Sequence, residues 1–483
     1  MGFLANMDLT GMVWLGLLAV MGGLVSKWIY RLYIHPLSKV PGPKIAAFTS
    51  LWLAYHTYIG DECTVVFKLH RKYGSVLRVG PNEVDISNAD AIEPIYITHG
   101  GFPKASAYSK FDIDGHNTIF STLTLAERTT RAKSVAPLFS TASLRQSEPL
   151  LSQVSNDFAT RVRNEARTGK PVDVLNLSRC LAIDSVTSYL FQNRYGALGE
   201  TSKNMSASPF VDAFVGVGAF FNLIPGRINN LLMSIHGSII SSEASVKAFG
   251  MIDRFTSNVI RTAAPKSGSY QSRLLEKQTS VQSQIEVKDI TFAGTDSTAM
   301  NTATILWYLA KYPEIYDRLH EEVQNAVFRG ENPTECAYLR ATVKEGLRLS
   351  WTNPIRLPRT VPAMGWNYRD YFFPAGTNVG IAAFQLHQNE SVFLDPLRFS
   401  PERWLVPTQD MLDHFFAFGK GTRSCIAQSL GMLEVTMGIC KVVEQDLLRG
   451  ATIFGHEQIK VKQWFNSRVE GEGIMIKFKV NHD

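Results

Sequence analysis

The sequence of 483 residues has little of what marks several common protein classes. It holds five cysteines, and no two are spaced as Cys-x-x-Cys, which argues against a disulfide scaffold and a structural zinc site. The net charge of +6 is small for this length, so nucleic acid is not an expected partner. No Gly-x-Gly-x-x-Gly fingerprint of a dinucleotide site occurs. Any redox chemistry must therefore draw its electrons from a partner.

The composition is that of a folded chain, with 45% hydrophobic and 19% charged residues. No repeat and no low-complexity linker interrupts it. The middle of the chain carries helical periodicity over segments of ten to thirty residues. Short strand-like runs occur early and late, at Val76–Val79, Glu83–Ile86, Arg356–Val361, Val379–Phe384 and Gly473–Val480. We therefore predict a mainly α domain with small peripheral β-sheets over residues 45–483.

An uncharged run, Leu9–Ser26, stands near the N-terminus and is long enough to cross a bilayer as a helix. Basic residues follow the run but do not precede it, at Lys27, Arg31, Lys39 and Lys44. Because positive charge stays cytoplasmic, residues 1–8 are predicted to be lumenal and the bulk cytosolic, on the endoplasmic reticulum membrane. A cleaved signal peptide is the alternative, but the basic n-region and the cleavage site that it needs are lacking.

Residues 27–44 form a basic connector that contains Pro36, Pro41 and Pro43, so we predict a stiff, non-helical segment. The predicted topology would also leave three glycosylation sequences without sugar, at Asn176, Asn204 and Asn389.

Residues 204–242 are nearly free of charge and rich in Phe and Leu. They are interpreted either as a buried helix pair or as an apolar surface that meets the membrane or covers a pocket.

Cys425 differs from the other four cysteines in its neighbours. Gly419 and Gly421 precede it, and a helical pattern follows it. A helix start carries partial positive charge and free N–H groups, which favour a thiolate, and a thiolate is a metal ligand. Arg423 adds a cation that can pair with a carboxylate on a cofactor. The remaining cysteines are interpreted as small buried hydrophobic residues.

The segment FGKGTRSCIA resembles the haem-binding signature of the cytochrome P450 family. Phe418, Gly421, Arg423 and Cys425 match it, and Ala427 replaces its last glycine. The resemblance implies haem b with Cys425 as the axial thiolate on iron. It also implies that Phe418 packs against this ligand and that Arg423 holds a haem propionate.

Three further segments resemble the family in the correct order. Glu345 and Arg348 lie on one helix face at i, i+3 spacing, and the family pairs such residues with a later arginine, here Arg403. The resemblance implies structural support beneath the haem, and it assigns Arg356 to a second propionate. Residues 126–140 resemble a helix whose basic residues, here Arg128, Arg131 and Lys133, meet the propionates; a solvated basic face is the alternative.

The segment 286–312 is predicted to be one long helix that contains Ala293, Gly294 and Thr295 at its centre. A glycine inside a helix costs about 1 kcal/mol relative to alanine, which close helix packing or a dioxygen groove would justify. The family has an acid–alcohol pair here that delivers protons. Asp296 fits the acid, and either Ser297 or Thr298 the alcohol.

The resemblance implies a monooxygenase that inserts one oxygen atom from dioxygen into a lipophilic molecule, such as a terpenoid or polyketide of fungal secondary metabolism. Its implied partners are an NADPH–cytochrome reductase, membrane lipid and dioxygen. Five apolar residues are candidates for the substrate pocket, namely Phe111, Ile119, Phe120, Phe214 and Phe292. The alternatives are a haem-thiolate isomerase, dehydratase or desaturase, and a haem sensor without turnover.

Overall fold

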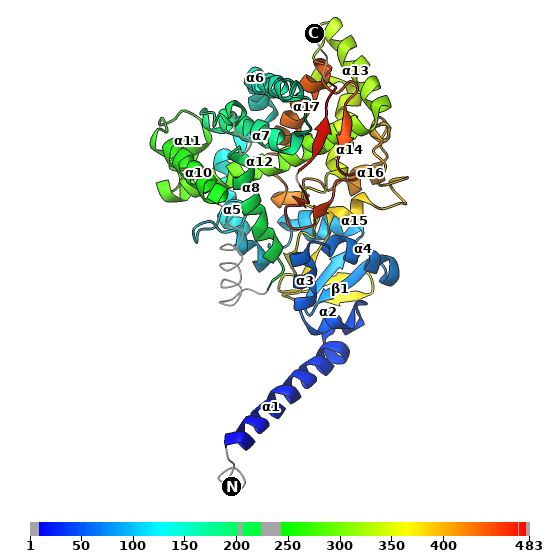
Figure 1. The fold of residues 1–483 in the computed structure, drawn as a ribbon. Coiled ribbons are helices and arrows are strands. Elements are labelled where there is room, and N and C mark those ends of the chain that lie inside the picture. The colour runs from blue at the N-terminus through cyan, green and yellow to red at the C-terminus, as the bar shows by residue number, and fades with distance from the viewer. Residues whose placement is uncertain (1–8, 201–204, 224–242, 472, 480–483) are drawn as a thin grey trace.

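A computed structural model describes residues 9–200, 205–223, 243–471 and 473–479 (Figure 1). Its helices are α1 (Leu9–Ile29), α2 (Lys44–Phe48), α3 (Leu51–Ile59), α4 (Glu62–Tyr73), α5 (Leu125–Val135), α6 (Thr141–Ala166), α7 (Val174–Phe191), α8 (Ala207–Val217), α10 (Glu243–Arg261), α11 (Tyr270–Leu275), α12 (Ser280–Lys311), α13 (Pro313–Phe328), α14 (Ala337–Leu349), α15 (Ala383–His387), α16 (Gln409–His414) and α17 (Gln428–Glu444). Its strands are β1 (Val76–Gly80), β2 (Glu83–Ile86), β3 (Val172–Asp173), β4 (Arg359–Thr360), β5 (Trp366–Tyr368), β6 (Tyr371–Phe373), β7 (Asn378–Gly380), β8 (Thr452–Phe454), β9 (Val461–Lys462), β10 (Arg468–Val469) and β11 (Met475–Lys477). The predicted class, mainly α with small sheets, is confirmed.

The helical core is built around α7 and α12. Every residue of α7 except Asn176 is buried, because the helix packs between α6 and α12. The long helix α12 passes through the middle of the body (Figure 1) and also contacts α14 and α17. Some residues of α12 thus pack in the core, and others line the cavity described below.

The sheets lie at the periphery. The largest has the strand order β1-β2-β7-β4, in which only β2 and β7 run parallel. It lies beside α2, α3 and α4, close to where α1 joins the body (Figure 1). A three-stranded sheet, β3-β11-β8, ties the start of α7 to the end of the chain.

Three predicted strands are shorter in the structure. The segment 356–361 pairs as a strand only at Arg359–Thr360, where Pro358 and Pro362 interrupt it with missing N–H donors. The segment 379–384 changes from β7 to helix α15 at Ala383. The last strand is confined to Met475–Lys477, and Val480 lies outside the described residues.

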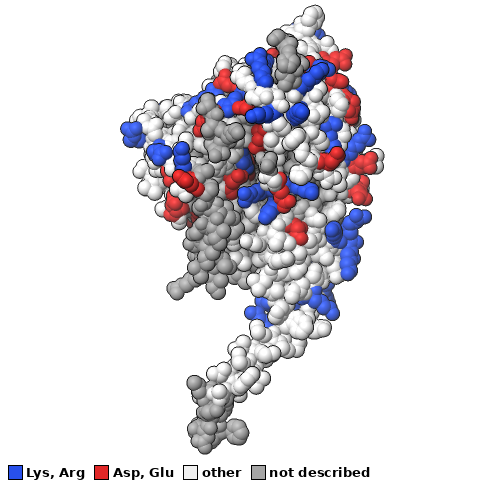
Figure 2. All heavy atoms as spheres, viewed as in Figure 1, with Lys and Arg blue, Asp and Glu red and all other residues white. Residues whose placement is uncertain are grey.

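The N-terminal helix α1 extends away from the body (Figure 1) and carries no charged side chain before Lys27. Figure 2 shows basic side chains gathered where it meets the body. The segment Met12–Ile34 is long and apolar enough to cross a membrane, a test that an N-terminal signal sequence also passes. The predicted lumenal residues 1–8 lie outside the described residues.

The prediction of a non-helical connector over residues 27–44 is wrong in part. Helix α1 runs to Ile29, a π-helical turn covers Tyr30–Ile34, and a 3₁₀ turn covers Pro36–Lys39. Proline at the first position of a helical turn loses no hydrogen bond, so Pro36 is compatible with it. The backbone at Val40 and Pro43 is extended, as the prediction of a non-helical connector requires.

The low-charge region is described only in part, because Asn204 and residues 224–242 lie outside the described residues. Within residues 205–223, helix α8 buries Phe210, and Phe220 follows in a buried 3₁₀ turn. This part fits the buried interpretation. Phe214 is half-buried and borders the cavity, as the pocket interpretation requires.

Candidate active site

The loop between α16 and α17 brings Cys425 to a large cavity. Gly419 and Gly421 have positive φ values, 65° and 74°, which glycine adopts without strain. A Cβ on Gly421 would stand 1.8 Å from the carbonyl oxygen of Tyr96, so no other residue fits there. The N–H of Cys425 donates to the oxygen of Phe418 at 2.9 Å and closes the turn. Both Phe418 and Cys425 line the cavity.

The electrostatics of Cys425 differ from the expectation. Helix α17 begins at Gln428, so the cysteine precedes the helix by three residues. Burial raises the pKa of the Cys425 thiol, and a hydrogen bond with the backbone of Ala427 opposes this only in part. The helix start therefore does not by itself favour the thiolate, because burial is the larger effect. A cation bound at the sulfur would supply the missing stabilisation.

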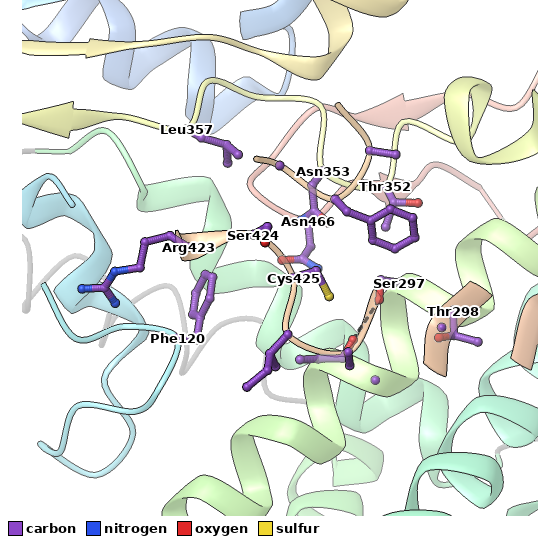
Figure 3. A pocket seen from close by; sticks show the side chains of 18 of the residues that line it. Phe120, Ser297, Thr298, Thr352, Asn353, Leu357, Arg423, Ser424, Cys425 and Asn466 are labelled. Atoms are coloured by element: carbon purple, nitrogen blue, oxygen red, sulfur yellow. Dashed lines mark hydrogen bonds between the residues drawn. The ribbon is translucent and has the colours of Figure 1, made fainter. Parts of the chain in front are cut away.

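Five basic residues line the same cavity: Lys420, which donates to the carbonyl oxygen of Leu412 at 3.5 Å, and a group of four formed by Lys104, Arg128, Arg359 and Arg423. None of the four forms an ion pair with any residue that the structure describes. Arg423 donates to the carbonyl oxygens of Thr122 and Leu123, both at 3.0 Å, and Figure 3 shows it directed away from Cys425. Burial, Arg128 and Arg359 lower the pKa of Arg423 to about 10.

These features match the shape and charge of haem. Most of the lining is apolar, which suits a flat apolar macrocycle, and Arg128, Arg359 and Arg423 suit its two carboxylates. A cysteine sulfur reaches the same cavity, as an axial ligand must. The residues present therefore fit the group.

Three basic residues assigned from the sequence do not reach the cavity. Arg356 is buried beside the four-stranded sheet, where it pairs with Glu83 of β2 at 2.6 Å. Arg359 lies three residues further, on the opposite face of an extended segment, and lines the cavity in its place. Lys133 is exposed on α5, and Arg131 pairs with Glu286 at 3.0 Å. The 100° turn per residue explains why α5 presents only Arg128.

Helix α12 supplies the opposite wall, where Ala293, Gly294, Ser297 and Thr298 line the cavity. A Cβ on Gly294 would stand 2.9 Å from Val186 of α7, so close helix packing justifies this glycine. Figure 3 shows the Cys425 sulfur on the side that faces Ser297. The cysteine loop and the centre of α12 thus enclose one site.

The two candidate hydroxyls have different partners. Ser297 donates to the carbonyl oxygen of Ala293 at 2.9 Å and is exposed to the cavity. Thr298 is buried and donates to Glu434 of α17 at 3.2 Å. The Ser297 hydroxyl is therefore the one that a molecule in the cavity can reach.

Asp296 is not among the residues that line the cavity. It accepts a hydrogen bond from Asn466 at 3.0 Å, and Arg179 lies 3.7 Å away. Burial, opposed by Arg179, raises the pKa of Asp296 to about 6. Arg179 and Asn466 were not predicted; Asn466 borders the cavity and links it to the acid.

The ion-pair network forms as the sequence suggested. Glu345 holds Arg348 through two bonds of 2.8 Å and Arg403 at 3.0 Å, and Trp404 donates to it as well. His387 connects this network to the cysteine loop, because it contacts the oxygen of Arg348 and accepts from the N–H of Phe416, both at 3.0 Å. Burial lowers the pKa of His387 to about 3, so it is neutral.

All five predicted pocket residues line the cavity, namely Phe111, Ile119, Phe120, Phe214 and Phe292. Phe214 stacks on Phe292 with ring centroids 4.3 Å apart. Phe465 packs against Phe111 and Phe120 and was not predicted. The aromatic lining suits a lipophilic molecule.

The chain matches the family model of cytochrome P450 over residues 40–445. It is similar to the cytochrome P450 monooxygenase mfmF of Annulohypoxylon moriforme, at 37% identity over 93% of this chain and 96% of the relative. The monooxygenase atnE of Emericella nidulans is 25% identical over 97% and 96% of the two chains. Pisatin demethylase of Fusarium vanettenii is 27% identical over 86% and 84%. The chain therefore belongs to the cytochrome P450 family and is an oxidoreductase of the monooxygenase type.

Proposed function

We propose that this protein inserts one oxygen atom from dioxygen into a lipophilic fungal metabolite, with Cys425 as the axial ligand of haem b. The observation that carries the proposal is that one cavity joins the Cys425 sulfur, the Ser297 hydroxyl and several arginines that pair with no carboxylate in the described part of the chain. Arg128, Arg359, Arg423 and Lys104 would hold the propionates. When bound, haem with a thiolate ligand supplies the activation of dioxygen.

The residues of the chain then handle protons and exclude water. Ser297 is the hydroxyl that serves the cavity, since Thr298 is held by Glu434. Asp296 supplies protons from the far side of α12, and a pKa of about 6 suits exchange near neutral pH. The aromatic side chains around Phe120 and Phe292 exclude water from the substrate and orient it.

The membrane location of the enzyme and the docking site of its reductase are proposed from its exposed residues. Helix α1 would anchor the chain in the endoplasmic reticulum membrane with the catalytic domain in the cytosol. Exposed apolar side chains near the anchor, including Leu51, Tyr55 and Tyr58 of α3, would rest on lipid. An NADPH–cytochrome reductase would dock on the side of the cysteine loop, where Lys344 and Lys420 lie close together.

The proposed substrate class rests on the similarity to fungal relatives and on the residues that line the cavity. Relatives with monooxygenase names come from fungi, and the pocket is aromatic. A terpenoid or polyketide skeleton fits both. The deciding experiment supplies membranes containing the full chain and a reductase with NADPH, labelled dioxygen and a lipophilic extract of the source organism. A product that carries one labelled oxygen is expected, and an unlabelled product would overturn oxygen insertion.

The ligand assignment has its own control. The variant Cys425→Ser should bind haem without the absorption signature that carbon monoxide gives with thiolate-ligated iron. Retention of this signature by the variant would show that another residue ligates the iron.

A further inference from the structure

One acidic side chain faces the apolar part of the cavity without a role in the proposed chemistry. Among the described residues around the cavity, Asp289 and Glu434 are the two acids. Glu434 lies on α17 and accepts from Thr298. Asp289 lies on α12, one helical turn before Ala293, beside Ile119, Ile290 and other apolar lining residues. It therefore faces the space where a substrate would lie.

The surroundings of Asp289 leave it available to a ligand. No described residue forms an ion pair with it. Among the described residues, the side chain of Thr118 is its hydrogen-bonding neighbour. Burial, and next the nearby Glu286, raise the pKa of Asp289 to about 7. Near neutral pH this carboxyl can thus both accept and donate a hydrogen bond.

The charged neighbours are all engaged elsewhere. Lys104 donates to the carbonyl oxygen of Phe120 at 2.5 Å and lies 4.1 Å from the ring centroids of Tyr108 and Phe120. Glu286 is held by Arg131 and by the N–H of Ile119. Asp112 accepts from Ser121 at 2.6 Å. A carboxyl group placed against apolar walls costs free energy unless a partner satisfies it, which points to the substrate.

We propose that Asp289 anchors the substrate by a hydrogen bond to a hydroxyl group on its lipophilic skeleton. The proposal rests on the proposed function and adds a substrate class, a hydroxylated lipophilic molecule. Four residues of α-helix separate Asp289 from Ala293 and eight separate it from Ser297, or roughly 6 and 12 Å along the axis. The anchored hydroxyl and the oxidised carbon are thus separated by a distance of this order.

The test uses probes that bind haem iron through an imidazole and differ only at the far end. They are 1-alkylimidazoles with chains of six, eight or ten carbons that end in a hydroxyl, a methoxy or an amino group. Binding to the purified, haem-loaded full chain is followed by the optical change on ligation of iron. This readout needs no turnover, and it fails altogether if the chain binds no haem, which separates failure of the proposed function from failure of the anchor.

At the best chain length, the hydroxyl probe should bind about tenfold more tightly than the methoxy probe, as one hydrogen bond to a buried carboxyl permits. Asp289→Leu should reduce this ratio to near one, while Asp289→Asn, which still accepts a hydrogen bond, should keep part of it. Asp317→Asn, an exposed substitution on α13, is the matched control and should keep the full ratio.

Three results would overturn the proposal. The hydroxyl and methoxy probes could bind equally to the wild-type protein at every chain length. The ratio could survive Asp289→Leu unchanged in protein with full haem content. The amino probe could bind most tightly, which would make Asp289 a site for cations.

Discussion

Two groups of arginines near the cysteine loop differ in what neutralises them. Arg348 and Arg403 share the carboxylate of Glu345, which is completely buried. Arg359 and Arg423 have no carboxylate partner among the described residues and face the cavity instead. A buried charge without a partner is costly. The charges of the first group are neutralised by a carboxylate of the same chain, whereas those of the second group would be neutralised by a bound ligand. Pairing, more than burial, thus separates structural arginines from those of the site.

The largest effect is expected from breaking the paired group. Glu345→Gln leaves Arg348 and Arg403 without their shared carboxylate, which should lower the free energy of unfolding by about 3–5 kcal/mol. Most of the variant should fail to fold, and chemical denaturation of the remainder should show the loss. Glu314→Gln, at an exposed position of α13, should stay within about 0.5 kcal/mol of wild type. An unchanged midpoint for Glu345→Gln would contradict the contrast between the groups.

Replacing an arginine of the unpaired group should affect haem affinity more than it affects stability. Arg423→Leu removes a cation that has no carboxylate partner among the described residues, although it also removes the hydrogen bonds to Thr122 and Leu123. The haem-free protein should therefore lose much less stability than Glu345→Gln does. Haem affinity should fall at least tenfold, because a charge-assisted hydrogen bond to a propionate is lost. Haem content per chain and haem transfer to an acceptor protein measure this.

A matched pair on α5 sharpens the same test. Arg128→Leu should weaken haem binding, whereas Lys133→Leu, on the exposed face, should leave it unchanged. Equal losses from both would restore the interpretation of α5 as a helix that meets the propionates along its whole basic face.

The two groups also differ in how far sequence reasoning reached them. The i, i+3 spacing of Glu345 and Arg348 predicts one helix face, and the family resemblance added Arg403, so this group could be predicted. Arg359 could not be chosen over Arg356, because the face of a strand depends on its register in the sheet. Lys104 stands in a loop without a motif, and only the fold brings it to the cavity.

The helical body followed from periodicity, but the ends of its elements depended on tertiary contacts. Helix α12 begins at Ser280, six residues before the predicted start, because Thr279 caps it through the N–H of Gln282. The sequence left the choice between Ser297 and Thr298 open, because it depends on the position of Glu434 on another helix.

The comparison between paired and free groups extends to the hydroxyls of α12. Ser297→Ala should slow product formation about tenfold and divert electrons to hydrogen peroxide, since the hydroxyl that faces the cavity is lost. Thr298→Ala should keep the coupling of NADPH to product, because its hydroxyl already serves Glu434. NADPH consumption, product and peroxide are measured together. Loss of coupling in Thr298→Ala alone would exchange the two roles.

The smallest expected effect concerns Asp296, which Arg179 pairs only loosely, at 3.7 Å. Its pKa is raised from 3.8 to about 6, so the folded state binds more protons than the unfolded chain between these values. The contribution of Asp296 to stability should therefore decrease as the pH rises from 4 to 6, by on the order of 1 kcal/mol. Asp296→Asn does not titrate, and the difference in unfolding free energy between wild type and variant isolates this residue. A difference that stays constant over this range, or that changes in favour of the wild type as the pH rises, would show that Arg179 neutralises Asp296 fully, as Glu345 is neutralised in the paired group.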